Sequence, residues 1–108
     1  MSIPKHVELS EPWRALEHER AEAMDMQLQL ELAPDHLLYG AEVKAVAKRI
    51  DKDDVLFELN GVGNLLAQVH LTWSKKPVTN PFPATKLFPG WDEWVREKLV
   101  PDCKEYAG

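Results

Sequence analysis

Residues 54–73 constrain the fold of this chain more than any other stretch. Two apolar runs rich in Val, Leu and Phe flank a five-residue segment, residues 60–64, that contains Asn and Gly. Such a segment gives a reversing backbone the conformational freedom it needs, and strand-like runs on both sides of it are typical of a β-hairpin. We therefore predict two antiparallel strands joined at residues 60–64.

The pairing of these strands follows if Leu59 lies opposite Leu65, which also pairs Val55 with Val69. Because side chains alternate between the two faces of a strand, this register gives one apolar face. The members of that face are Val55, Phe57, Leu59, Leu65, Ala67, Val69, Leu71 and Trp73. The opposite face carries Asp54, Leu56, Glu58, Leu66, Gln68, His70 and Thr72, with Asp54 beside His70.

Residues 13–32 consist almost entirely of helix-forming types, and Ser10, Glu11 and Pro12 before them are typical of a helix start. Pro34 ends the predicted helix. Residues 24–32 alternate apolar and polar side chains, which is the period of a strand. The lack of β-branched residues favours helix here, and a strand at 24–32 stays the alternative.

The segments around the hairpin complete the prediction. Residues 42–50 fit a helix face or a strand face; the short turn at 51–53 favours a strand that pairs antiparallel with the hairpin. Four prolines between positions 77 and 89 indicate an ordered extended loop or an edge segment, pinned by Phe82, Leu87 and Phe88. Residues 91–100 have one apolar side and are predicted to form a final helix that Pro101 ends.

The expected fold is a single α+β domain over residues 1–108: an N-terminal helix, a three-stranded antiparallel β-meander, a proline-rich loop and a C-terminal helix. Both helices are expected on one face of the sheet. Residues 1–9 are expected to form a flexible arm and residues 101–108 a tail.

Composition narrows the classes of function. The chain is 44% hydrophobic and 29% charged, and it has no apolar run long enough to span a bilayer. Its start lacks the layout of a signal peptide, and its lone Cys103 suits a reducing compartment, so we expect a cytoplasmic protein. A net charge of −5 argues against nucleic acid as a partner. No cofactor is expected.

Several segments resemble a group of small bacterial proteins usually described only as uncharacterised. They are Gly40, the run Val43-Lys44-Ala45-Val46-Ala47-Lys48-Arg49, the run from Asp51 to Phe57, the string Val69-His70-Leu71-Thr72-Trp73, and Glu93-Trp94 after the proline-rich loop. The Val-His-Leu-Thr-Trp string is the most specific of them. The resemblance implies a strand over residues 42–49 and brings no activity with it.

His70 is the candidate for chemistry, because a histidine beside a carboxylate such as Asp54 can be oriented for proton transfer. The alternative is a structural hydrogen bond on a half-buried sheet. His36, His70, Asp54 and Glu58 have the residue types of a metal site, but no short ligand spacing occurs, and no metal is expected. The segment Gly61-Val62-Gly63 has no following Lys or helix, so it is a weak phosphate cradle.

Two functional hypotheses follow. The first is a non-enzymatic protein-interaction or regulatory module, because catalytic motifs are lacking and a tryptophan left exposed among Trp13, Trp73, Trp91 and Trp94 would mark a protein-binding hot spot. The alternative is a small hydrolase or ligand-binding enzyme centred on His70 and Asp54. The residues expected at the binding surface are Gln68, His70, Thr72, Phe82 and Trp91.

Overall fold

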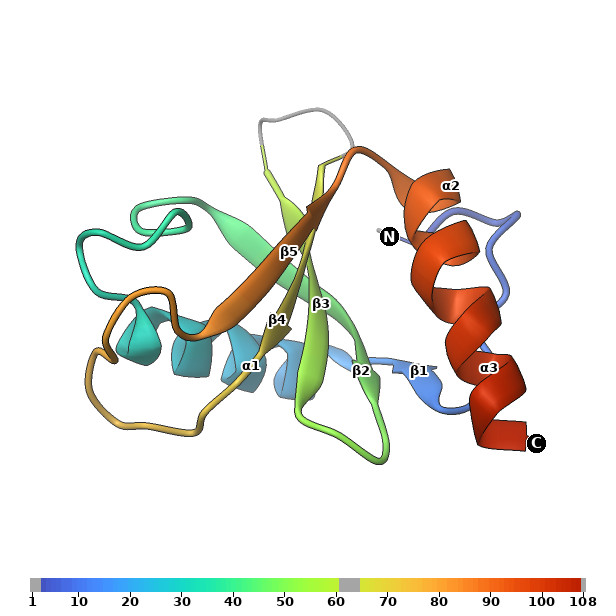
Figure 1. Ribbon diagram of the computed structural model, residues 1–108, viewed down its shortest axis with the longest axis horizontal. Helices are drawn as coiled ribbons and strands as arrows, with labels where there is room; N and C mark the ends of the chain where they lie inside the picture. Colours follow the sequence, from blue (N-terminus) through green and yellow to red (C-terminus); the bar gives the residue numbers. More distant parts are fainter. Residues whose placement is uncertain (1–2, 61–64, 108) are drawn as a thin grey trace.

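The computed structural model describes residues 3–60 and 65–107, and within them five antiparallel strands form a meander in chain order (Figure 1). The strands are β1 (Trp13–Ala15), β2 (Val43–Arg49), β3 (Asp54–Leu59), β4 (Leu66–His70) and β5 (Ala84–Phe88). The predicted α+β class and antiparallel sheet are confirmed. The predicted three-strand count is wrong, because β1 and β5 add one strand at each edge.

The predicted hairpin register is confirmed. Asp54 pairs with His70, Val55 with Val69, and the Leu59 amide donates to the Leu65 carbonyl at 3.0 Å. The apolar side chains at Val55, Phe57 and Val69 favour this register, since a one-residue slip would turn them to the wrong face. Residues 61–64 of the expected loop, including Gly61-Val62-Gly63, lie outside the described residues.

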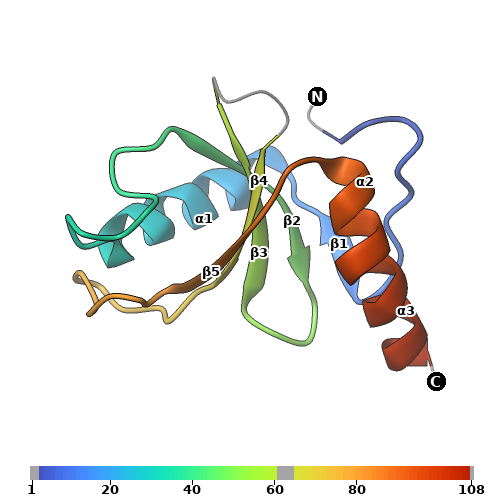
Figure 2. The ribbon, with the colours of Figure 1, turned by 45° about the horizontal axis from the view of Figure 1, so that its top comes forward.

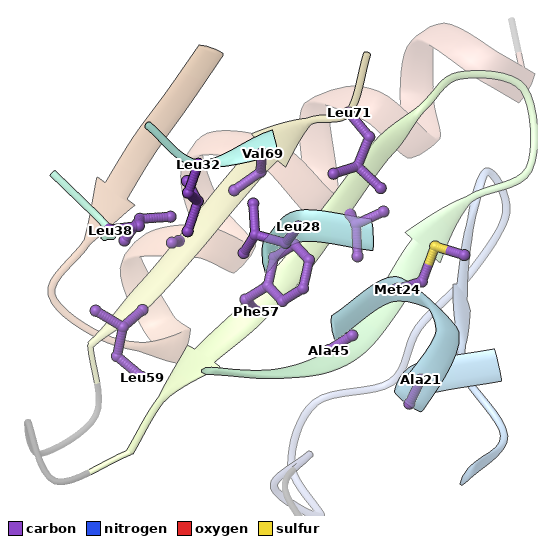
Figure 3. Close-up of a cluster of buried hydrophobic side chains, with 12 residues drawn as sticks. Ala21, Met24, Leu28, Leu32, Leu38, Ala45, Phe57, Leu59, Val69 and Leu71 are labelled. Carbon is purple, nitrogen blue, oxygen red and sulfur yellow. The ribbon is translucent and has the colours of Figure 1, made fainter. Parts of the chain in front are cut away.

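Helix α1 (His18–Glu31) covers one face of the sheet and confirms the helix at residues 24–31. Figure 3 shows its buried side chains packed on the apolar face of the hairpin. The shared cluster comprises Ala21, Met24, Leu28, Leu32, Leu38, Ala45, Val55, Phe57, Leu59, Ala67, Val69 and Leu71.

The predicted helix start at residues 10–13 is wrong, because Trp13–Ala15 pairs with β2 as strand β1. The indole of Trp13 is 1% exposed, and the Ile50 amide donates to the Pro12 carbonyl at 2.8 Å. Burial and pairing with a distant strand therefore outweigh the helix propensity of this segment.

The second face of the sheet is covered by the C-terminal helix, which consists of α2 (Trp91–Trp94), a π-helical turn (Val95–Leu99) and α3 (Val100–Ala107). The two helices thus lie on opposite faces, and the prediction of one shared face is wrong. The prediction failed because two leucines on the nominally polar face, Leu56 and Leu66, are fully buried and give the C-terminal helix a second apolar surface. The cluster on this side comprises Val7, Trp13, Val46, Ala47, Leu56, Leu66, Phe88, Trp91, Trp94 and Leu99.

Pro101 does not end the C-terminal helix as predicted. Proline has no amide hydrogen, and its ring clashes with the carbonyl four residues earlier in a regular α-helix. The wider π turn at Val95–Leu99 precedes it, and residues up to Ala107 stay helical. The N-terminal arm runs beside this helix (Figure 2), and Val7 is buried against it.

The proline-rich segment ends in β5, which pairs antiparallel with β4. Of the side chains expected to pin it, Phe88 is buried, whereas Phe82 and Leu87 are exposed. No helix in the described part of the chain combines the length and the apolar character that crossing a membrane requires.

Candidate functional site

Asp54 and His70 form a close side-chain pair at the ends of β3 and β4. The register places them directly opposite each other, and 2.5 Å separates His70 Nδ1 from Asp54 Oδ1. The carboxylate is 17% exposed and the imidazole 55% exposed. The protein side of the ring is therefore fixed by a carboxylate, while Nε2 faces away from it, as in the acid–base pairs of many active sites.

Two further side chains continue this pair into the core. Trp94 Nε1 donates to Gln68 Oε1 at 3.0 Å, and Gln68 Nε2 donates to Asp54 Oδ2 at 3.2 Å. An indole N–H can only donate, so Gln68 must present its oxygen to Trp94 and its amide hydrogens to Asp54. Trp94 is fully buried. Donation thus runs from Trp94 through Gln68 to Asp54, and the carboxylate accepts from His70 on its other oxygen.

The Asp54 carboxylate sets the protonation pattern of the imidazole, because it can only accept hydrogen bonds. Asp54 Oδ2 accepts from Gln68 and Oδ1 accepts from His70, so a neutral His70 carries its hydrogen on Nδ1. The lone pair of Nε2 is then free. A histidine in this state can accept a proton from a ligand or from water.

The imidazole opens into a shallow cleft of about 280 Å³. Its walls come from β3, β4, β5 and the C-terminal helix: Asp54, Gln68, His70, Ala84, Thr85, Lys86 and Lys98. Lys86 and Lys98 bring positive charge to it, although each has an acidic neighbour, Glu97 at 3.4 Å and Asp102 at 3.7 Å.

A buried ion cluster beside the cleft fixes the C-terminal helix to the sheet. Arg49, 5% exposed, binds Asp51 through Nε at 2.9 Å and Asp102 through Nη1 at 3.2 Å. The Trp13 indole donates to Asp102 at 2.9 Å. The hydrogen bond from Arg49 lowers the pKa of Asp51 and, in return, raises the pKa of Arg49.

Thr72 and Trp73 do not lie where the sequence pattern placed them. The buried carboxylate of Glu31, at the end of α1, accepts hydrogen bonds from the Thr72 amide and hydroxyl at 2.8 Å and from the Trp73 amide at 3.0 Å. Gln27 Nε2 donates to it at 2.7 Å. Held by this carboxylate, Trp73 takes a left-handed backbone with φ of 62° and leaves the sheet, so its ring is exposed instead of in the core.

The other histidines lie apart from the cleft. His36 is buried; its Nδ1 accepts from the Leu38 amide at 3.0 Å, so Nε2 carries the hydrogen and donates to the Pro83 carbonyl at 3.0 Å. This makes His36 a structural link between two loops. His6 and His18 are exposed, beside Asp92 and Glu22 respectively.

Of the remaining expected residues, Phe82 is 52% exposed, whereas Trp91 is buried edge-on against Trp94 with ring centroids 5.7 Å apart. Burial raises the pKa of Cys103, whose thiol donates to the Ser10 carbonyl at 3.4 Å, so the sulfur stays protonated. In the described ranges, no three His, Cys, Asp or Glu side chains are grouped to hold a metal ion.

The sequence pattern thus located Asp54, Gln68 and His70 together and missed Trp94 and Lys98. The hairpin register was the signal for the first three. No comparable signal exists for the other two, since their place depends on how the C-terminal helix crosses the sheet.

Comparison of the chain with protein families, curated proteins and solved structures finds no match. The resemblance to small uncharacterised bacterial proteins therefore stays an expectation.

Proposed function

We propose that the cleft at the ends of β3 and β4 is a small-molecule site in which His70 transfers protons. The observation that carries this proposal is the hydrogen-bond chain from the buried Trp94 through Gln68 and Asp54 to the exposed imidazole. A purely structural histidine needs partners for its ring, but it needs no polarised chain that leaves Nε2 free in a cleft.

The mechanism follows from the protonation pattern. Nε2 of neutral His70 accepts a proton from a bound ligand or from a water molecule, and the resulting imidazolium stays beside the Asp54 carboxylate. The same imidazolium can then return the proton as a general acid. Such catalysis typically contributes about 10²–10⁴-fold to a rate.

The walls of the cleft favour a ligand with negative charge. Lys86 and Lys98 line it, and the exposed Glu97 beside Lys86 can give way to a ligand, whereas Lys98 stays near the buried Asp102. Thr85 also lines the cleft, but its hydroxyl donates to the Pro83 carbonyl at 2.9 Å and lies 3.4 Å from Nε2 of the buried His36.

The reactivity of the four histidines toward diethyl pyrocarbonate tests the proposal. This reagent acylates an unprotonated, accessible imidazole nitrogen, and mass spectrometry locates each modified residue. We expect His70 to react at a rate comparable with that of the exposed His6 and His18. His36 should react slowest, because both of its nitrogens are buried and bonded. His6 and His18 are exposed internal references.

A small anionic ligand of the cleft should protect His70 and leave His18 unchanged. If His70 reacts as slowly as His36 in the wild-type protein, its Nε2 is not free and the proposal is wrong. A cytoplasmic location, expected from the sequence, belongs to this proposal as well.

A protein-interaction module is the second candidate, supported by the exposed ring of Trp73. Trp73 is 43% exposed, and Glu31 holds its backbone in an unusual conformation. A photoreactive residue at the exposed Phe82 should crosslink to one partner, and Trp73→Ala should abolish that crosslink. A photoreactive residue at Lys104, far along α3, is the matched control; equal crosslinking from both positions would argue against a defined surface.

A further inference from the structure

A second hollow, of about 390 Å³, lies at the other edge of the sheet, between β1, the end of β2 and the first turn of α1. Its charged walls are Arg14, Glu17, Arg20, Lys48 and the buried Arg49. The chain has a net charge of −5, yet four of these five charged residues are cations, and Glu17 is the one anion among them.

Two of these cations face each other across the strands. Arg14 of β1 is the register partner of Lys48 of β2. Their neighbours Trp13 and Arg49 point to the C-terminal helix, so Arg14 and Lys48 point to the α1 side. Like charges directly opposite on a sheet repel each other and destabilise the pairing. An anion between them would turn this repulsion into attraction.

The nearby carboxylates neutralise these cations only in part. Arg49 is neutralised by Asp51 and Asp102, and Arg14 forms an exposed ion pair with Glu11. Exposed ion pairs are weak, so a ligand can displace Glu11. Among residues 3–60 and 65–107, neither Lys48 nor Arg20 has a carboxylate within 4.0 Å.

Lys48 is nevertheless held in place. Its ammonium donates to the Arg49 carbonyl at 2.9 Å and to the Lys52 carbonyl at 2.8 Å. An ammonium has three donors, so one remains for a ligand. The charge of Lys48 is thus positioned by neutral carbonyls and stays uncompensated.

We propose that this hollow binds a small phosphate-bearing molecule, with its phosphate group between Arg14, Lys48 and Arg20. A phosphate monoester carries about −1.5 to −2 charges at pH 7, and the planar guanidinium of arginine matches two phosphate oxygens at once. The site lies on the face of the sheet opposite His70 and is independent of the proposed function of that residue.

A titration with inorganic phosphate, followed by amide chemical shifts of the full-length protein at constant ionic strength, tests the proposal. We expect the amides of residues 14–17 and 48–50 to shift and to saturate. Arg14→Gln and Lys48→Gln should each weaken phosphate binding about tenfold, as the loss of one charge-assisted hydrogen bond implies. Lys75→Gln, which removes an exposed lysine of the 72–83 loop, should leave the affinity unchanged.

Lys48→Gln also removes a link to the Lys52 carbonyl and can weaken folding. Arg14→Gln and Arg20→Gln then carry the test, since both side chains are exposed. The proposal is overturned if these variants bind phosphate as Lys75→Gln does, or if chloride alone produces the same shifts. Acetate that binds more tightly than phosphate would overturn the assignment of the ligand class.

Discussion

Replacement of Asp54 by asparagine should move the hydrogen of the His70 ring from Nδ1 to Nε2. The change keeps the size and shape of the side chain and removes only its charge. An amide, unlike a carboxylate, has one accepting and one donating end. Its orientation therefore decides which nitrogen of His70 is protonated.

The structure fixes that orientation. Trp94 can only donate, so Gln68 keeps its oxygen toward Trp94 and its amide hydrogens toward position 54. The introduced asparagine must then turn its oxygen to Gln68 and its own amide hydrogens to His70 Nδ1. That nitrogen becomes an acceptor, and the hydrogen moves to Nε2, which can no longer take up a proton as a free base.

The size of the effect follows from the unfavourable alternative. If the introduced asparagine turned its oxygen to His70, its amide group would face that of Gln68, donor to donor, near the fully buried Trp94. A buried donor left without an acceptor costs about 1–3 kcal/mol. At about 2 kcal/mol the Nε2-protonated form is favoured about 30-fold, since 1.4 kcal/mol corresponds to a factor of ten.

Long-range ¹H–¹⁵N spectra of the labelled rings measure the protonated nitrogen directly. Wild-type His70 should show the proton on Nδ1 and the Asp54→Asn variant should show it on Nε2, with slower acylation by diethyl pyrocarbonate. Asp54→Asn combined with Gln68→Leu releases the constraint, so the two forms should mix. A proton that stays on Nδ1 in Asp54→Asn alone would refute the polarised chain.

Three further predictions concern stability. Glu31→Ala leaves four part-buried donors, from Gln27, Thr72 and Trp73, without an acceptor and should lower the free energy of unfolding by about 3 kcal/mol, whereas exposed Glu22→Ala should change it by less than about 0.5 kcal/mol in urea titrations. Arg49→Met removes the nearer cation of the buried Asp102, which keeps Lys98 at 3.7 Å and the Trp13 indole, and should cost about 3 kcal/mol, against little for exposed Arg96→Met; equal losses would contradict the ion cluster. Burial raises the pKa of Asp25 above its ordinary 3.8, so the folded state binds the proton more tightly and wild-type stability falls as the pH rises through that pKa. Asp25→Asn lacks this loss, so its unfolding free energy relative to wild type should increase with pH above 3.8 and then stay constant; a pH-independent difference would contradict this.

The parts of the fold that could be predicted are those set by local pattern. Period-two alternation and the spacing of the loop specify the hairpin register, which in turn places Asp54 beside His70. The lack of β-branched residues was the correct guide to helix at residues 24–31. Both inferences depend on neighbours close to one another in the chain.

The predictions that were wrong concern segments whose structure depends on contacts with distant parts of the chain. Trp13–Ala15 has helix-forming residues, but pairing with β2 and burial of Trp13 make it a strand. By pattern, Leu56 and Leu66 are exceptions on a polar face, but in the structure the C-terminal helix packs against them. Pro101 is a reliable helix terminator only in a regular α-helix, and the π turn before it removes the conflict.

Trp94 illustrates why the candidate site could be only half predicted. Its ring packs edge-on against Trp13, with centroids 5.0 Å apart, and its burial alone would assign it to the core. Yet its indole hydrogen decides the orientation of Gln68 and, once asparagine replaces Asp54, the protonated nitrogen of His70. A phenylalanine at this position would conserve much of the packing and remove the indole donor. Trp94→Phe added to Asp54→Asn should therefore leave the protein folded and let His70 exchange between its two protonated forms, whereas Trp94→Phe alone should keep the hydrogen on Nδ1 beside the carboxylate. Trp94 therefore both packs in the core and donates the hydrogen bond that orients Gln68, and the hydrophobic pattern alone does not reveal the second role.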